Sequence, residues 1–171
     1  MKTLYLVRHA KSSWENPEVG DVERPLNDRG KRDAPAMGVR LRKLKVNPDL
    51  MITSYAKRAR ATCTRIAKEL GYSEQRIREE SRLYHANEGD IISVLRNLDD
   101  KYERVMAFGH NPGLTDFVNA FSTEEEVTDN IPTCGVVAFE IPLNTWSAIE
   151  FGTGKLLFYD YPKRDFRSSS E

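Results

Sequence analysis

The sequence predicts an α/β fold, a three-layer sandwich in which a mostly parallel sheet carries helices on both faces. Short apolar segments typical of buried strands alternate with segments whose apolar residues recur at helical spacing. The last two strand-like segments follow one another without a helix, which predicts an antiparallel edge strand. A chain of 171 residues has the length of one ordinary domain, so we expect a single domain over residues 1–171.

The first elements are a strand, a long loop, a helix and a second strand. Residues 3–8 combine aromatic and β-branched side chains in the pattern of a strand. Residues 9–27 are polar and contain two prolines and a glycine, which predicts a loop. Asp28 is the predicted N-cap of a helix that runs to about residue 44. The segment "DLMITS", residues 49–54, is the next short strand.

Two further helices are predicted before the next strand. Ser54 is the predicted N-cap of the first, whose apolar stripe has helical spacing. The residues of this stripe are Ala59, Thr62, Cys63, Ile66, Ala67 and Leu70. A weaker helical pattern covers about residues 89–98.

The rest of the chain supplies one buried strand, one helix and the final pair of strands. "RVMAFGH", residues 104–110, is apolar enough for a buried strand, and Pro112 starts the helix behind it. Residues 134–141 and 155–161 are the last two predicted strands. We expect the serine-rich tail from Lys163 to be frayed.

The composition excludes several classes of protein. The 26 basic and 26 acidic residues balance, so no net charge attracts the chain to nucleic acid or to a membrane surface. No apolar run approaches the ~20 residues that span a bilayer, and the amino-terminal apolar run is too short for a signal peptide. Cys63 and Cys134 make no disulfide framework, which predicts buried thiols in a cytoplasmic protein.

Three polar segments follow the carboxyl ends of predicted strands. These are the pair Arg8–His9, the segment from Ser54 to Arg58, and "GHNPG", which contains His110. Ligands of open α/β sheets bind outside the carboxyl ends of the strands, so we expect these side chains to share one pocket. Guanidinium groups match the oxygens of a phosphoryl group, and an imidazole can attack its phosphorus. The sequence therefore predicts phosphoryl chemistry at this end of the sheet.

Four segments together resemble a known family. "LVRHAKSSW", "ERPLNDRGKRDA", "TSYAKRARATC" and "FGHNPGL" are similar to motifs of the histidine phosphatase superfamily, which is phosphoglycerate mutase-like. The resemblance extends from residue 3 to about residue 160, and it is strongest to the short SixA-like branch of phosphohistidine phosphatases. Ala10 stands where the family usually has glycine, as is common in that branch. The resemblance implies that His9 is the nucleophile and becomes phosphorylated.

The resemblance also implies the rest of the site. Arg8, Arg58 and His110 are the expected partners of His9 in catalysis and in binding the phosphate. Other expected substrate-binding residues are Arg24 and Asn27 of the long loop, together with Asn111. No cofactor and no metal are expected, because the histidines lack acidic or cysteine co-ligands at typical spacing.

The general acid is the open part of this site. Larger members of the family carry a carboxylate after the second helix, where this chain offers Glu80, Glu88 and Asp90, the last of which could equally be an N-cap. An alcohol leaving group needs a proton donor. Phosphohistidine can bring its own proton, because imidazole titrates at about 6.5. A weak or absent acid therefore favours a phosphohistidine substrate.

Each motif also has a plainer interpretation. Arg8–His9 could be a solvated loop start, Arg58 one more charge on an exposed helix, and His110 a helix cap. His85 is either a surface residue or the edge of the pocket. The occurrence of the motifs together favours the site. "FGTGKL" lacks the spacing of a phosphate-binding Walker loop, and neither cysteine is followed by the arginine that a cysteine phosphatase needs.

These observations favour a phosphatase that hydrolyses phosphohistidine on a protein, with a role in signal transduction. A phosphatase of small sugar or nucleotide phosphates and a non-catalytic binder of phosphorylated ligands are the alternatives. A mutase is disfavoured, because the chain lacks insertions that would retain an intermediate. The expected partner is a phosphorylated protein or a small phosphorylated substrate, and the oligomeric state is not predicted.

Overall fold

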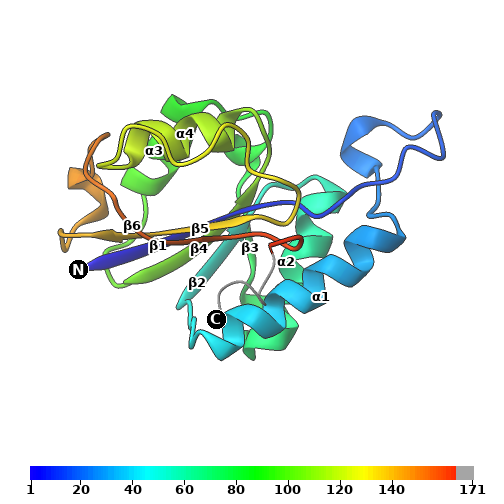
Figure 1. The fold of residues 1–171 in the computed structure, drawn as a ribbon, viewed down its shortest axis with the longest axis horizontal. Helices are drawn as coiled ribbons and strands as arrows, with labels where there is room; N and C mark the ends of the chain where they lie inside the picture. Colours follow the sequence, from blue (N-terminus) through cyan, green and yellow to red (C-terminus); the bar gives the residue numbers. More distant parts are fainter. Residues whose placement is uncertain (165–171) are drawn as a thin grey trace.

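A computed structural model describes residues 1–164, which form one six-stranded sheet in the order β3-β2-β4-β1-β5-β6 (Figure 1). At its centre, β1 (Lys2–Arg8) pairs in parallel with β4 (Arg104–Gly109). On the far side of β4, β2 (Leu50–Thr53) is also parallel, and the two-residue β3 (Arg78–Glu79) pairs with it.

The other edge of the sheet is antiparallel. β5 (Val136–Ile141) runs antiparallel to β1, and β6 (Lys155–Asp160) runs antiparallel to β5. The predicted α/β fold with a mostly parallel sheet and an antiparallel edge is therefore confirmed. The connection between these two strands contains only the 3-10 turn η4 (Trp146–Ala148) and no α-helix of the kind that usually forms a crossover between parallel strands.

The helices form the two outer layers. α1 (Asp28–Lys43) and α2 (Lys57–Leu70) pack against each other on one face, while α3 (Glu88–Arg96) and α4 (Gly113–Phe121) cover the opposite face (Figure 1). No helix in the described part of the chain is long and apolar enough to cross a membrane.

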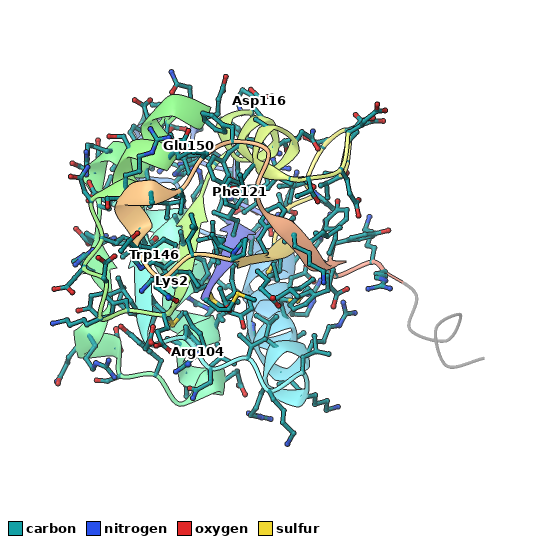
Figure 2. All side chains as sticks on the ribbon, turned by 90° about the vertical axis from the view of Figure 1, so that its left-hand side faces the viewer. Lys2, Arg104, Asp116, Phe121, Trp146 and Glu150 are labelled. Atoms are coloured by element: carbon teal, nitrogen blue, oxygen red, sulfur yellow. The ribbon has the colours of Figure 1, made fainter. Side chains whose placement is uncertain are left out.

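The alternation of side chains along β1 produces two cores. Leu4 and Leu6 belong to the apolar cluster under α3 and α4, whereas Tyr5 and Val7 belong to the cluster under α1 and α2. Successive side chains of a strand point to opposite faces, so a strand covered on both sides must be apolar throughout. Phe121, labelled in Figure 2, is a fully buried member of the first cluster.

Buried polar groups stabilise the end of the sheet away from the carboxyl ends of the parallel strands. The Nζ atom of Lys2 donates to the carbonyl of Tyr102 at 2.9 Å, and the indole nitrogen of Trp146 donates to the same oxygen at 2.7 Å (Figure 2). Both side chains are fully buried. Packed side chains therefore close this end of the sheet.

The observed N-caps of α1 and α3 differ from the predicted ones. α1 is capped by Asn27, whose side-chain oxygen accepts from the amide of Gly30 at 2.9 Å, so the predicted cap Asp28 is the first helical residue. α3 is capped by Asn87, and Asp90 lies at the third helical position, where it bonds back to the cap. The interpretation of Asp90 as the N-cap was therefore wrong. Asparagine and aspartate are nearly equal as caps, so the sequence alone could not distinguish the two positions.

The remaining predicted elements occur within a few residues of the predicted limits. Sequence patterns contain no signal for β3 or for the short 3-10 turns, among them η1 (Asp21–Glu23) inside the predicted loop and η3 (Ser81–Leu83). The predicted frayed tail begins at Lys163, and its residues 165–171 lie outside the described part.

Candidate active site

The register of the sheet brings two histidines side by side. Arg8, the last residue of β1, is aligned with Gly109, the last residue of β4. The next residues, His9 and His110, therefore lie together beyond the carboxyl ends of the central strands, with ring centroids 5.2 Å apart. β1 and β4 form the switch point of the sheet, because the connection after β1 leads toward one edge and the connection after β4 leads toward the other. Ligands of α/β sheets bind at such a switch point.

The third segment joins them from β2. Ser54 follows that strand and its hydroxyl lies 2.8 Å from Nε2 of His110. The predicted role of Ser54 as the N-cap of α2 was wrong, because Ala56 holds that position. Ser54 accepts from the amide of Ala56 at 3.2 Å, which tightens the turn into the helix. Arg58 then lies buried in the first turn of α2.

One cavity of about 220 Å³ collects most of the predicted site. It is lined by six of the predicted catalytic and substrate-binding residues: Arg8, His9, Arg24, Arg58, His110 and Asn111. Within residues 1–164, no aspartate or glutamate side chain lines it. Its polar lining is thus cationic or neutral, which suits a ligand with clustered anionic oxygens.

A single hydrogen bond orients the ring of His9. Its Nδ1 atom lies 2.7 Å from the carbonyl oxygen of Ala10. A carbonyl only accepts, so neutral His9 carries its proton on Nδ1 and has a lone pair on Nε2. No residue of the described chain hydrogen-bonds to Nε2. This is the tautomer that a nucleophilic imidazole requires.

The surroundings of His9 keep that imidazole neutral. Burial is the main cause that lowers its pKa to about 4, and the positive charges of Arg58, Arg8 and Arg24 lower it further, while the bond to Ala10 opposes them. Burial likewise lowers the pKa of His110 to about 3. At neutral pH both imidazole rings are therefore uncharged.

A buried threonine ties the loop of His9 to helix α2. Thr62 accepts from the amide of Ala10 at 2.9 Å and donates to the carbonyl of Arg58 at 2.8 Å. All of these groups are buried, so the bonds fix the position of His9 relative to the first turn of the helix.

Asp21 holds the guanidinium of Arg58. The Nη1 and Nη2 atoms of Arg58 donate to the carbonyl and the carboxylate of Asp21 at 2.7 and 3.1 Å. The Nε atom of Arg24 donates to the carboxylate of Asp21 at 3.3 Å. The hydroxyl of Tyr84 also donates to this carboxylate. The bonds from Tyr84 and then Arg58 hold the pKa of Asp21 well below its usual range. Asp21 is therefore a carboxylate that positions arginine.

The other two arginines are anchored by different partners. Arg8 donates to the carbonyl of Ile131 at 2.8 Å. Burial lowers the pKa of Arg8, but a guanidinium keeps its charge at neutral pH. Arg24 donates to the hydroxyl of Ser12 at 2.6 Å and stacks on the exposed ring of Trp14, 3.6 Å from its centroid. Each guanidinium is thereby held at the cavity wall.

Unsatisfied nitrogen atoms mark the same place. Among residues 1–164, the buried side-chain atoms without a hydrogen-bond partner are Nε of Arg8, Nε of Arg58 and Nδ1 of His110. A buried polar group without a partner costs about 1–3 kcal/mol. All three belong to residues that line the cavity, so the protein concentrates this cost where a ligand would bind.

Two predicted binding residues serve the scaffold. The side chain of Asn27 caps α1 and does not line the cavity. Asn111 lines the cavity, but its amide nitrogen donates to Asn130 and Ile131, and its oxygen accepts from Thr115. Asn111 therefore holds the loop after His110 in place.

The three carboxylates considered as general acid lie elsewhere. Glu80 accepts from the amide and side chain of Arg82, and Asp90 belongs to the cap of α3. Glu88 is a half-buried residue at the start of α3. None of them lines the cavity, so none is placed to protonate a ligand bound there.

Several residues were missed or left open by the sequence. Asp21 and Tyr84 carry no motif, because their role depends on contacts across 37 and 63 positions. His85 lies at the edge of the cavity, so the surface interpretation was incomplete. The predicted burial of both cysteines is confirmed. The described residues contain no group of three His, Cys, Asp or Glu side chains suited to a metal.

The depressed pKa values predict an unusual titration. We expect His9 and His110 to stay neutral down to about pH 4 and 3, whereas unfolded histidines titrate at about 6.5. The unfolded state then binds more protons between pH 6.5 and 3, so stability falls as the pH is lowered through that window. Imidazole NMR signals followed against pH, assigned with His9→Ala and His110→Gln, measure this; titration of either ring near 6.5 would contradict it.

The chain is similar to several known proteins. The family model described as histidine phosphatase superfamily (branch 1) matches residues 4–117. An uncharacterized chloroplastic protein of Arabidopsis thaliana is 29% identical over 153 residues, which are 85% of this chain and 69% of that protein. A 2,3-bisphosphoglycerate-dependent phosphoglycerate mutase of Brucella anthropi is 34% identical over 101 residues, which are 58% of this chain and 48% of the mutase.

Among solved structures, the fold is similar to a SixA protein of Agrobacterium tumefaciens that is assigned as a phosphohistidine phosphatase. The TM-score is 0.78 at 23% identity, and the alignment covers 94% of this chain and 98% of that chain. At this level of identity the similarity shows a shared fold.

Proposed function

This chain belongs to branch 1 of the histidine phosphatase superfamily, and on that basis we propose that it is a phosphatase that works through a phosphorylated His9. The observation that carries the proposal is the free Nε2 atom of a neutral His9 at a cavity walled by guanidinium groups. Nε2 attacks phosphorus and the leaving group departs on the opposite side. Water then attacks the phosphohistidine, releases inorganic phosphate and restores His9.

The rest of the site stabilises the charge that moves during both transfers. Arg8 and Arg58 carry positive charges at the cavity wall, and His110 adds a neutral hydrogen-bonding ring. Phosphoryl transfer is catalysed mainly by positioning and by stabilising charge on the equatorial oxygens. Guanidinium groups provide this without proton transfer or a metal.

For the substrate, we propose phosphohistidine carried by another protein, which would place the chain in cytoplasmic signal transduction. Two observations support this choice. No carboxylate among residues 1–164 lines the cavity, and a phosphorylated imidazole is the leaving group that depends least on an acid. The structurally similar SixA protein of Agrobacterium tumefaciens is also assigned as a phosphohistidine phosphatase.

A substrate comparison tests the proposed function. We expect the purified chain to release phosphate from a phosphohistidine protein with a kcat/KM at least about tenfold above that for alkyl phosphates, because a phosphorylated imidazole can bring its own proton whereas an alkoxide must receive one from the enzyme. The rate should be unchanged after exhaustive treatment with EDTA. Faster hydrolysis of sugar or nucleotide phosphates would support the small-ester alternative. Phosphate binding without any turnover would contradict the proposed phosphatase activity and would support a non-catalytic binding protein.

A further inference from the structure

His85 has a strained backbone at the edge of the cavity. It follows η3 in the turn that leads to α3, and its φ angle of 55° lies in the left-handed region that non-glycine residues seldom adopt. Its side chain is 72% exposed, so no burial of that side chain compensates for the conformation. Strain of this kind concentrates at functional sites. The position of the ring therefore calls for a functional explanation.

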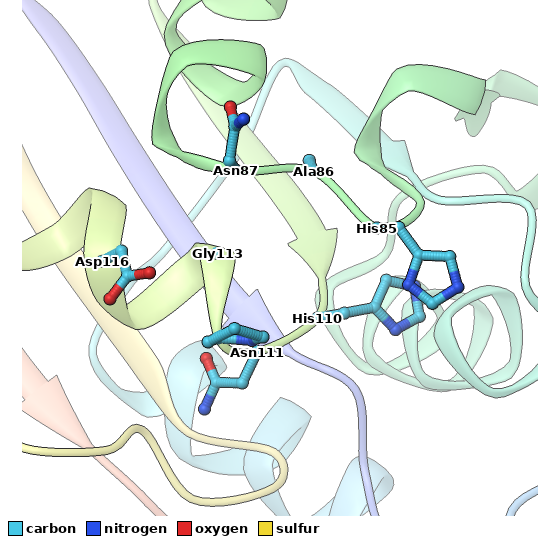
Figure 3. A pocket seen from close by; sticks show the side chains of 8 residues that line it. His85, Ala86, Asn87, His110, Asn111, Gly113 and Asp116 are labelled. Atoms are coloured by element: carbon cyan, nitrogen blue, oxygen red, sulfur yellow. The ribbon is translucent and has the colours of Figure 1, made fainter.

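Close packing holds His85 beside the loop of His110. A Cβ atom on Gly113, at the start of α4, would come within 1.7 Å of the carbonyl oxygen of Ala86, so only glycine lets the two segments meet. The ring of Tyr84 contacts both histidines, with centroid distances of 4.0 Å to His85 and 5.5 Å to His110. Figure 3 shows the two imidazoles beside each other.

His85 lies between two cavities. Beyond it is a second hollow of about 170 Å³, whose lining includes Asn87 and Asp116 (Figure 3). His85, His110 and Asn111 line both this hollow and the cavity of His9. A phosphoryl group on His9 in the first cavity and a leaving group in the second would place the bridging oxygen at their boundary, next to His85.

The other groups near that boundary are poor proton donors. His9 and His110 are neutral at working pH, and arginine does not release its proton. Asp21 is an ionised carboxylate that accepts hydrogen bonds. Its Oδ2 atom lies 4.0 Å from Nε2 of His85. Asp116 lines only the second hollow.

We propose that His85 is the general acid for alkyl phosphomonoesters, which the same site would then hydrolyse in addition to phosphohistidine; this rests on the proposed phosphatase function. As Nε2 of His9 forms its bond to phosphorus, the bond from phosphorus to the ester oxygen breaks. The imidazolium of His85 gives its proton to that oxygen, and an alcohol leaves. Neutral His85 then takes a proton from water as the water oxygen attacks phosphorus and the bond to His9 breaks.

The test compares leaving groups in His85→Asn, since asparagine tolerates left-handed backbone and cannot titrate. The kcat/KM values for ethyl phosphate and 4-nitrophenyl phosphate are compared, because they report the step in which the ester bond breaks. We expect a loss of about 10²-fold or more with ethyl phosphate, and less than about fivefold with the nitrophenyl ester, whose leaving group needs no proton. Lys45→Asn is the control, because Lys45 is an exposed residue with a φ angle of 62°.

A pH profile supplies a second readout. The charged or titratable groups that face His85 are Asp21, Tyr84, Arg58 behind Asp21, His110, and Asp116 across the second hollow. We expect His85→Asn to remove the fall in ethyl phosphate hydrolysis on the alkaline side, and Asp116→Asn to leave the leaving-group dependence as in the wild type. An equal loss with both esters, no loss, or transfer of the effect to Asp116→Asn would overturn the inference. A wild-type chain inactive on every phosphorylated substrate would instead overturn the proposed function.

Discussion

His9→Ala reduces the hydrolysis of every phosphorylated substrate to the uncatalysed background. Among the described residues that line the cavity, the substitution removes the one imidazole that a carbonyl orients and that keeps a free lone pair. Loss of a nucleophile from a catalytic unit typically costs about 10⁶ in kcat. The variant should still bind inorganic phosphate, because Arg8, Arg58 and His110 remain at the cavity.

Steady-state kinetics and phosphate binding of the folded variant measure this. Thermal unfolding checks the fold, since a buried imidazole is being truncated. Persistent turnover in His9→Ala, at a rate within about tenfold of the wild type, would be incompatible with nucleophilic catalysis by this residue.

Arg58→Ala is expected to lower kcat by about 10³-fold or more, the range of an arginine that stabilises transferred phosphoryl groups. Asp21 holds this guanidinium through two bonds, so the charge is already positioned before the substrate binds. Arg58→Lys should restore only a small part of the loss, because an ammonium group cannot reproduce the paired donors.

Arg60 offers a matched control on the same helix. Its side chain is 49% exposed and pairs with Glu79 at 3.2 Å, away from the cavity. We expect Arg60→Ala to change kcat by less than about twofold, because exposed ion pairs contribute little. Equal losses in Arg58→Ala and Arg60→Ala would mean that general basic charge, and not a positioned guanidinium, supports the reaction.

The central part of the fold and site was accessible from the sequence because it depends on local patterns. The strand "TLYLVR" is apolar on both faces, and the polar pair after it must lie at the end of the sheet. The same reasoning located Arg58 and His110 after β2 and β4. Parallel pairing then brings such segments together whatever the details of the loops.

The remaining features depend on long-range contacts that no local pattern encodes. Asp21 is an ordinary acidic residue of a polar loop until folding places it against Arg58 and Tyr84. Asn27 and Asp28 are adjacent residues with similar capping ability, so a choice between them required the observed bond to Gly30. The position of His85 depends on the contact between Ala86 and Gly113, which are 27 residues apart.

The most direct measurement is the chemical identity of the intermediate. The chain is mixed with substrate, quenched without acid in the first turnover, digested and analysed by mass spectrometry. The account predicts one phosphoryl group on the peptide that contains His9, lost in acid and absent from His9→Ala. A burst of released leaving group with no phosphate on that peptide, or phosphate on another residue, would contradict it.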